Sequence, residues 1–134
     1  MIGIVLDTNV LVSAMLSRNG NVALVLRIAR SGGFQVCISA AILDEYEDVL
    51  RRAAFRIPPE SVDQLLMDLR SKGLIVEPKI EVIASPHETD NRFLECAEEA
   101  RATYLVTGNK RHFPKDWKAT KIVNARGLLE ATTF

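Results

Sequence analysis

The stretch Ile2-Gly3-Ile4-Val5-Leu6-Asp7-Thr8-Asn9 decides the fold class. Residues 2–6 are apolar and rich in β-branched side chains, which is typical of a buried strand. The run stops at Asp7-Thr8-Asn9, whose polar side chains favour capping of a helix predicted over Val10–Leu16. A buried strand that leads straight into a helix indicates an α/β domain.

The rest of the chain repeats this alternation. Further strands are predicted over Phe34–Ile38, Leu74–Val76, Tyr104–Thr107 and Lys121–Val123, and further helices over 22–30, Ala40–Ala54, Glu60–Ser71, Glu88–Ala102 and Ala125–Ala131. Strands joined through helices need crossover connections, so we expect a mostly parallel, five-stranded sheet with helices on both faces. The sequence therefore predicts a three-layer α/β/α sandwich, with residues 1–134 as a single domain.

Composition narrows the class of protein. The chain is 48% hydrophobic and 25% charged, which is ordinary for a globular protein, and its 17 basic and 17 acidic residues cancel. Cys37 and Cys96 lie among apolar residues, so we expect buried, reduced thiols and a cytoplasmic location rather than a disulfide framework. The sequence has neither a signal-peptide pattern nor an apolar run long enough to span a membrane.

Asp7 directly follows the first predicted strand. In open parallel sheets, ligands bind outside the carboxyl ends of the strands, so Asp7 is a candidate site residue. The alternative is that its side chain only caps the next helix.

Glu45 interrupts an apolar surface. Ile42, Tyr46 and Val49 mark the buried stripe of the predicted helix Ala40–Ala54, and helical spacing puts Glu45 on its edge. A carboxylate there is costly unless it is paired, protonated or bound to a cation. A salt bridge with Arg52 is the structural alternative.

Asp90 repeats this pattern in the predicted helix Glu88–Ala102. It falls among the buried positions of Phe93, Leu94 and Ala97. Its place in the first turn also allows a purely structural role, since an acid there interacts favourably with the helix dipole.

Three acids from distant segments thus converge on one end of the sheet. Clustered carboxylates repel one another unless a cation neutralises them. Oxygen ligands without a His or Cys cluster favour a hard cation, Mg²⁺ or Mn²⁺. Such an ion can activate water and stabilise charge at a phosphoryl centre.

Four segments resemble the successive motifs of PIN-domain nucleases. They are IVLDTNVLV (4–12), SAAILDEYEDVL (39–50), DNRFLECA (90–97) and YLVTGNKRHF (104–113). Within that family they are most similar to the small toxins of bacterial toxin–antitoxin pairs (VapC-like). The resemblance implies a sheet of order 3-2-1-4-5 and Mg²⁺- or Mn²⁺-dependent hydrolysis of RNA.

The resemblance also implies roles for single residues. Asp7, Glu45 and Asp90 match the metal-binding acids. Thr8, Asn9 and Thr107 match residues that position them. Asn109 stands where many members have a fourth acid, which removes one negative charge, although its amide oxygen can still bind a metal or orient water. His87 stands where relatives often have another acid, and a solvated loop histidine is the alternative.

Residues 108–126 carry six Lys or Arg against one acid. Lys110, Arg111, His112 and Lys115 are candidates for contacts with RNA phosphates, and an ordinary solvated surface is the alternative. Trp117 is a candidate for base stacking or, alternatively, a packing residue.

The leading hypothesis is a metal-dependent endoribonuclease, the toxin of a toxin–antitoxin pair, with Asp7, Glu45, Asp90 and Asn109 as catalytic residues. The resemblance implies an antitoxin partner and a homodimer. A PIN-like module that binds RNA or protein without efficient catalysis is the alternative, because the fourth acid is missing. A phosphotransferase using Asp7 as nucleophile is weaker, because its usual second Asp is missing two residues further on.

Overall fold

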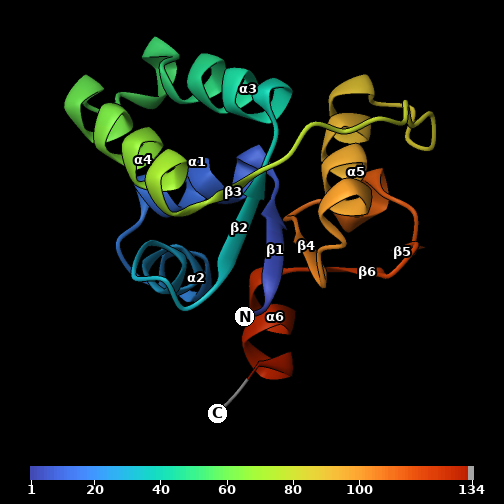
Figure 1. Cartoon of the computed structure of the whole chain (residues 1–134). Helices are drawn as coiled ribbons and strands as arrows, with labels where there is room; N and C mark the ends of the chain where they lie inside the picture. The colour runs from blue at the N-terminus through green and yellow to red at the C-terminus, as the bar shows by residue number, and fades with distance from the viewer. Residues whose placement is uncertain (133–134) are drawn as a thin grey trace.

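A computed structural model describes residues 1–132 and contains one six-stranded sheet (Figure 1). The strands are β1 (Gly3–Leu6), β2 (Gln35–Ile38), β3 (Leu74–Ile75), β4 (Tyr104–Val106), β5 (Asp116–Trp117) and β6 (Thr120–Val123). Their order is β3-β2-β1-β4-β6-β5, and all neighbours are parallel except β5 and β6. The strand order implied by the resemblance is confirmed for the five parallel strands.

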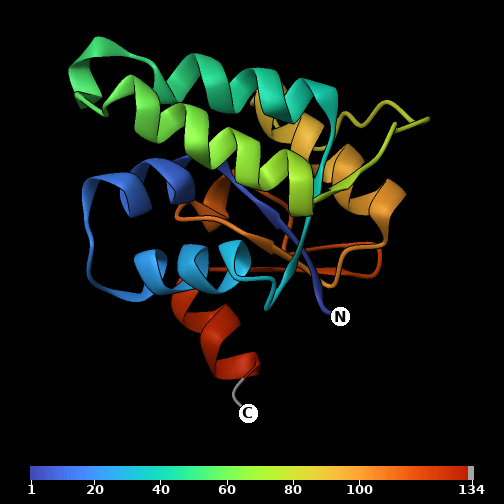
Figure 2. The ribbon, with the colours of Figure 1, turned by 60° about the vertical axis from the view of Figure 1, so that its left-hand side comes forward.

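Helices cover both faces of this sheet. They are α1 (Thr8–Leu16), α2 (Asn21–Arg30), α3 (Ala40–Leu50), α4 (Pro59–Lys72), α5 (Glu88–Ala100) and α6 (Ala125–Ala131). Figure 1 shows α1, α2 and α4 on one side of β1 and β2, and α5 on the other. In the view turned by 60°, α3 and α4 run alongside each other above the sheet and α6 lies below it (Figure 2). The predicted three-layer α/β/α sandwich is confirmed.

The apolar runs that predicted the strands form the core. Ile4, Val5 and Leu6 of β1 are completely buried, and this strand sits between β2 and β4. Cys37 and Cys96 are buried free thiols, as expected. Within residues 1–132, none of the helices has the length and apolar character needed to cross a bilayer.

The strand count is a correction. The segment 108–120 was expected to be a loop, but Asp116–Trp117 pairs antiparallel with the start of β6, Trp117 opposite Thr120. The hairpin turns through Lys118, whose φ of 55° is in the left-handed region. A two-residue strand is too short to show the alternation of apolar and polar residues that reveals a strand.

The predicted helix Ala40–Ala54 is also wrong at its end. Helix α3 stops at Leu50, and a separate 3₁₀ turn, η1, spans Ala53–Phe55. The guanidinium of Arg51 bonds both Glu47 of α3 and Asp63 of α4, which ties the end of α3 to the next helix. The break matters for the site because η1 carries Phe55, which lines the cleft described below.

Candidate active site

The site is built on the carboxyl ends of two adjacent strands. Asp7 follows β1 and Thr107 follows β4, and these strands pair in parallel through Leu6 and Val106. The backbone N–H of Asp7 donates to the carbonyl of Val106 at 2.9 Å. The topology therefore fixes Asp7 and Thr107 side by side, a hundred residues apart in the sequence.

The carboxylate of Asp7 is held by Thr107. The Thr107 hydroxyl donates to Asp7 Oδ2 at 2.6 Å and accepts the backbone N–H of Asn109 at 2.9 Å. Asp7 occupies the N-cap position of α1, but its side chain makes no capping hydrogen bond, and the helix begins at Thr8 rather than at Val10. The backbone N–H groups of Thr8 and Asn9 nevertheless lower the pKa of this carboxyl, so the start of α1 favours its ionised form.

Asn9 joins the two strand-end loops. Its Oδ1 accepts the backbone N–H of Gly108 at 3.2 Å, which leaves its amide nitrogen available to the site. Thr8 is buried, and its hydroxyl oxygen has no hydrogen-bond partner within residues 1–132. The structure therefore shows positioning contacts for Thr107 and Asn9, but none for the Thr8 hydroxyl.

Helix α3 carries Glu45 over the end of β1. The Ser39 hydroxyl accepts the N–H of Ile42 at 3.3 Å and caps the helix. The fully buried Tyr46 donates its hydroxyl to the carbonyl of Leu6 at 2.5 Å. This bond anchors α3 beside the residue that precedes Asp7, so Glu45 reaches the same place.

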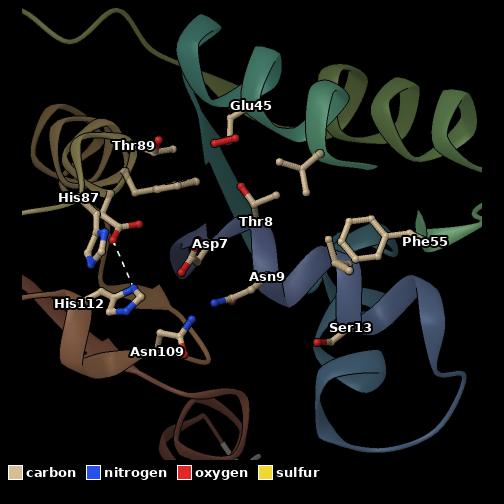
Figure 3. Close-up of a pocket in the computed structure, with 14 residues that line it drawn as sticks. Asp7, Thr8, Asn9, Ser13, Glu45, Phe55, His87, Thr89, Asn109 and His112 are labelled. Atoms are coloured by element: carbon tan, nitrogen blue, oxygen red, sulfur yellow. Dashed lines mark ion pairs between the residues drawn. The ribbon is translucent and has the colours of Figure 1, made fainter. Parts of the chain in front are cut away.

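Glu45 lacks an ion-pair partner in the part of the chain that the structure describes. The expected alternative partner, Arg52, instead pairs with Asp48, with 3.3 Å between Nη2 and Oδ2. Glu45 is half-buried and lines the site (Figure 3). Arg52 therefore makes no salt bridge with Glu45, although its charge still lowers the pKa of that carboxyl.

Asp90 completes the acidic group from the first turn of α5. Only 8% of the residue is exposed, and Oδ2 has no hydrogen-bond partner within residues 1–132. The imidazole Nδ1 of His112 is 3.6 Å from Oδ2, and the ring of His87 lies 4.3 Å from that of His112. A buried carboxylate oxygen without a partner is costly, and ligation of a cation would satisfy it.

These acids line one cleft of about 530 Å³, together with Asn9, Asn109 and both histidines (Figure 3). Burial raises the pKa of Asp7, the Thr107 hydrogen bond lowers it, and the charge of Asp90 raises it again. Burial also raises the pKa of Glu45, the charge of Arg52 lowers it, and the charges of Asp48 and Asp7 raise it. Burial and the charge of Glu45 raise the pKa of Asp90, while His112 and His87 lower it. Burial in the cleft therefore disfavours the ionised carboxylates.

The carboxylates share the cleft without forming a closed ligand set. Across residues 1–132, no three His, Cys, Asp or Glu side chains are gathered tightly enough to hold a metal ion together. The chemistry of the donors nevertheless fits a hard cation, since Asp90, whose Oδ2 has no hydrogen bond within residues 1–132, lines a cleft together with other oxygen ligands. Side-chain rotation, which is cheap for a half-buried Glu, would bring the donors together.

The basic residues lie at one side of this cleft. Lys110, Arg111 and His112 form a second 3₁₀ turn, η2, directly after Asn109. Among them only His112 lines the cleft, while Lys110, Arg111 and Lys115 are exposed. Trp117 lies outside the cleft and donates its indole N–H to Glu98 at 3.1 Å, as a packing residue does.

Sequence reasoning missed part of the lining. His87 was singled out with a solvated loop as its alternative; it is exposed, as that alternative expects, and it also lines the cleft and packs against His112. Phe55 and Ser13 were not singled out, because the break after α3 and the facing of α1 follow from tertiary packing. The spacing of Ser13 from Asn9, one helical turn, is the one signal that could have found it.

A buried network that was also missed holds the histidine side together. The Ser85 hydroxyl donates to the carbonyl of His112 at 2.6 Å and accepts the N–H of His87 at 3.2 Å. Asn91 accepts the N–H of Ser85 at 2.8 Å and donates to its carbonyl. These bonds fix η2 against the start of α5.

Comparison with known proteins identifies the family to which the chain belongs. The sequence model of the PIN domain matches residues 3–111. The chain belongs to the PIN domain family. That family consists of nucleases, which generally use divalent metals. No curated protein sequence matches the chain at a significant level.

A solved structure shares the fold. It is the crystal structure of VapBC2 from Rickettsia felis bound to a DNA fragment from their promoter, with a TM-score of 0.56 and 16% identity. The similarity covers 90% of this chain and 98% of that chain. The PIN chain described here and that protein therefore have the same arrangement of strands and helices.

Proposed function

We propose that this PIN-domain protein is a metal-dependent endoribonuclease that hydrolyses RNA phosphodiester bonds. One observation carries the proposal. Asp7, Glu45 and Asp90 come from three distant segments, line one cleft, and are not neutralised by any Lys or Arg ion pair within residues 1–132. Buried and half-buried acids that are gathered without Lys or Arg ion pairs are expected where a cation and a phosphate bind.

Asp7, Glu45 and Asp90 would hold Mg²⁺ or Mn²⁺, with Asn109 assisting through its amide oxygen. Such an ion lowers the pKa of bound water and stabilises charge at the phosphoryl centre. Thr107 keeps the carboxylate of Asp7 oriented, and Asn9 presents its amide N–H group to the cleft. Lys110, Arg111, His112 and Lys115 would contact the RNA backbone, and hydrolysis would leave 5′-phosphate and 3′-hydroxyl ends.

We further propose that the protein is the toxin of a toxin–antitoxin pair. The support is the fold that it shares with VapBC2, a toxin–antitoxin complex. An antitoxin that covers the cleft would then hold the nuclease inactive, and the protein would act as a homodimer in the cytoplasm. Exposed apolar side chains, among them Leu16, Met67 and Ile83, offer surface for protein contacts.

Asp7→Asn tests the nuclease assignment. The Asn side chain still accepts the Thr107 hydrogen bond, so the fold should survive while one negative ligand is lost. We expect Mg²⁺- and Mn²⁺-dependent cleavage of RNA by the wild type, and cleavage at background level by the variant. Asp116→Asn on β5, outside the cleft, is the matched control and should cleave normally.

Full Mg²⁺-dependent activity of Asp7→Asn would contradict the assignment. The alternative, an RNA- or protein-binding module, is favoured by two observations. Asn109 replaces an acid, and the acids do not form a closed ligand set within residues 1–132. Wild-type protein that binds RNA but leaves it intact across Mg²⁺ and Mn²⁺ titrations would support this alternative.

A further inference from the structure

The cleft extends beyond the acids to an apolar end. Val12, Ser13, Val49 and Phe55 line it there. Figure 3 shows Phe55 and Ser13 on the opposite side of Asp7 from His87 and His112. The two ends therefore offer different chemistry on either side of the carboxylates.

Phe55 is placed by the backbone of η1 and not by the core. Its N–H donates to the carbonyl of Arg52 at 3.1 Å, and the N–H of Arg56 donates to Ala53 at 3.2 Å. The turn closes with Arg56 in the left-handed region, at a φ of 55°. Phe55 is half-buried, yet among the described residues it is not one of those packed against the hydrophobic core, whereas Ile57 is.

The lining of this end suits a flat group with a polar edge. Phe55 provides an aromatic face, and the half-buried Val49 provides an apolar wall. The hydroxyl of Ser13 is exposed and makes no hydrogen bond to any of residues 1–132. A nucleobase stacks by its face and hydrogen-bonds by its edge, so it matches both features.

Charge at the two ends favours a strand that crosses the acids. Arg51 and Arg52 are engaged in ion pairs with acids, but Arg56, next to Phe55, has no ion pair within residues 1–132. At the other end, Lys110 and Arg111 are exposed beside His112. Exposed basic residues therefore lie next to cleft-lining residues in the sequence at both ends, Arg56 after Phe55 and Lys110 and Arg111 before His112, and such residues can contact the phosphates of a bound strand.

We propose that the Phe55 end of the cleft is a subsite for one unpaired nucleobase of the RNA, adjacent to the phosphate held at Asp7 and Asp90. This inference rests on the proposed function and assigns a contact with one base of its substrate. Bases in an A-form duplex are stacked and paired, so only an unpaired base can present its face to Phe55.

Abasic scanning tests the subsite. Short single-stranded RNAs, each with one abasic ribose at a different position around the cleavage site, are cleaved by wild type, Phe55→Leu, Phe55→Trp and Trp117→Leu. We expect one abasic position to slow the wild type by roughly 5- to 100-fold, the range that stacking of one base provides. Phe55→Leu should cleave the intact RNA more slowly by a similar factor and should lose its sensitivity to that position.

Two variants serve as controls. Phe55→Trp keeps an aromatic face and should keep the abasic sensitivity. Trp117→Leu removes a half-buried aromatic outside the cleft and should behave as the wild type. Circular dichroism and thermal melting check that each variant is folded, which we expect for Phe55 because its ring is outside the core.

Failure of the subsite and failure of the nuclease assignment give different results. If no abasic position slows the wild type, or if Phe55→Leu keeps the same abasic penalty, the subsite is refuted while the nuclease stands. If the wild type cleaves none of the RNAs, the proposed function fails. Binding of the same RNAs, followed by fluorescence anisotropy, then decides the subsite: affinity that depends on one base and on Phe55 supports it, and affinity that depends on neither refutes it.

Discussion

At the scale of single residues, Asp90 is an acid whose burial in the cleft costs the folded protein stability. Its carboxyl is buried, and one oxygen is without a hydrogen bond inside residues 1–132. Burial raises its pKa, the neighbouring His112 and His87 lower it, and the charge of Glu45 raises it. Folding therefore favours the protonated form of this acid when no metal is bound.

This shift predicts a pH dependence of stability. Because the pKa of Asp90 is higher in the folded state, its contribution to stability is complete below the unfolded pKa of about 3.9 and is lost as pH rises through the folded value. In EDTA at pH 7, Asp90→Asn should therefore melt a few degrees above the wild type, and the gap should close as the pH falls toward 4. Thermal unfolding followed by circular dichroism measures this.

The melting temperature in saturating Mg²⁺ is the second test of the role of Asp90. A ligand that binds only the native state stabilises it, so Mg²⁺ should raise the melting temperature of the wild type more than that of Asp90→Asn. An Asp90→Asn variant that is less stable than wild type in EDTA at pH 7 would show that this carboxylate is a structural group.

Residue patterns predicted the three acids but only part of their surroundings. An acid on an apolar helix face is visible in the sequence, as Glu45 and Asp90 show, because the helical period is known in advance. His87 and Phe55 gave no such signal. Their places depend on how loops and turns pack, for example on the Ser85 bonds that join His87 to His112.

At the scale of elements, Tyr46 links helix α3 to strand β1. Its fully buried hydroxyl donates to the carbonyl of Leu6. Tyr46→Phe removes this bond and leaves the buried carbonyl with one partner fewer, which costs about 1–2 kcal/mol. We expect a lower melting temperature and also weaker Mg²⁺ binding, because α3 would hold Glu45 less firmly over the strand end.

Tyr104→Phe is the matched control for this change. Tyr104 is half-buried, and its hydroxyl makes no hydrogen bond to any of residues 1–132. It should leave both the melting temperature and the Mg²⁺ affinity, measured by calorimetry, near the wild-type values. Unchanged Mg²⁺ affinity in Tyr46→Phe would mean that the anchoring of α3 does not position Glu45.

The order of elements was predictable, whereas their ends were not. Apolar runs rich in β-branched residues, such as residues 2–6, identify a buried strand on their own. At the break between α3 and η1, Arg51 reaches Asp63 on a helix that lies further along the chain. Such contacts between elements leave no periodic trace in the sequence, and neither does the two-residue strand β5.

At the scale of the whole molecule, the sheet topology brings the site together. Strands β1 and β4 are neighbours in the sheet, so Asp7 and Thr107 meet at the carboxyl ends of these strands. Helices α3 and α5 add Glu45 and Asp90. The net charge of the chain is zero, but the charges are unevenly distributed: acids line the cleft and basic residues lie beside it. This separation of charge is what an enzyme that binds a cation and an RNA backbone requires.

Diffraction from crystals soaked in Mn²⁺ tests the central claim most directly. The account predicts anomalous density inside the cleft, bonded to the carboxylates of Asp7 and Asp90, with Glu45 turned toward it, and its loss in crystals of Asp7→Asn. Anomalous density only at other sites, with Asp7 and Asp90 left without a metal at saturating Mn²⁺, would contradict it.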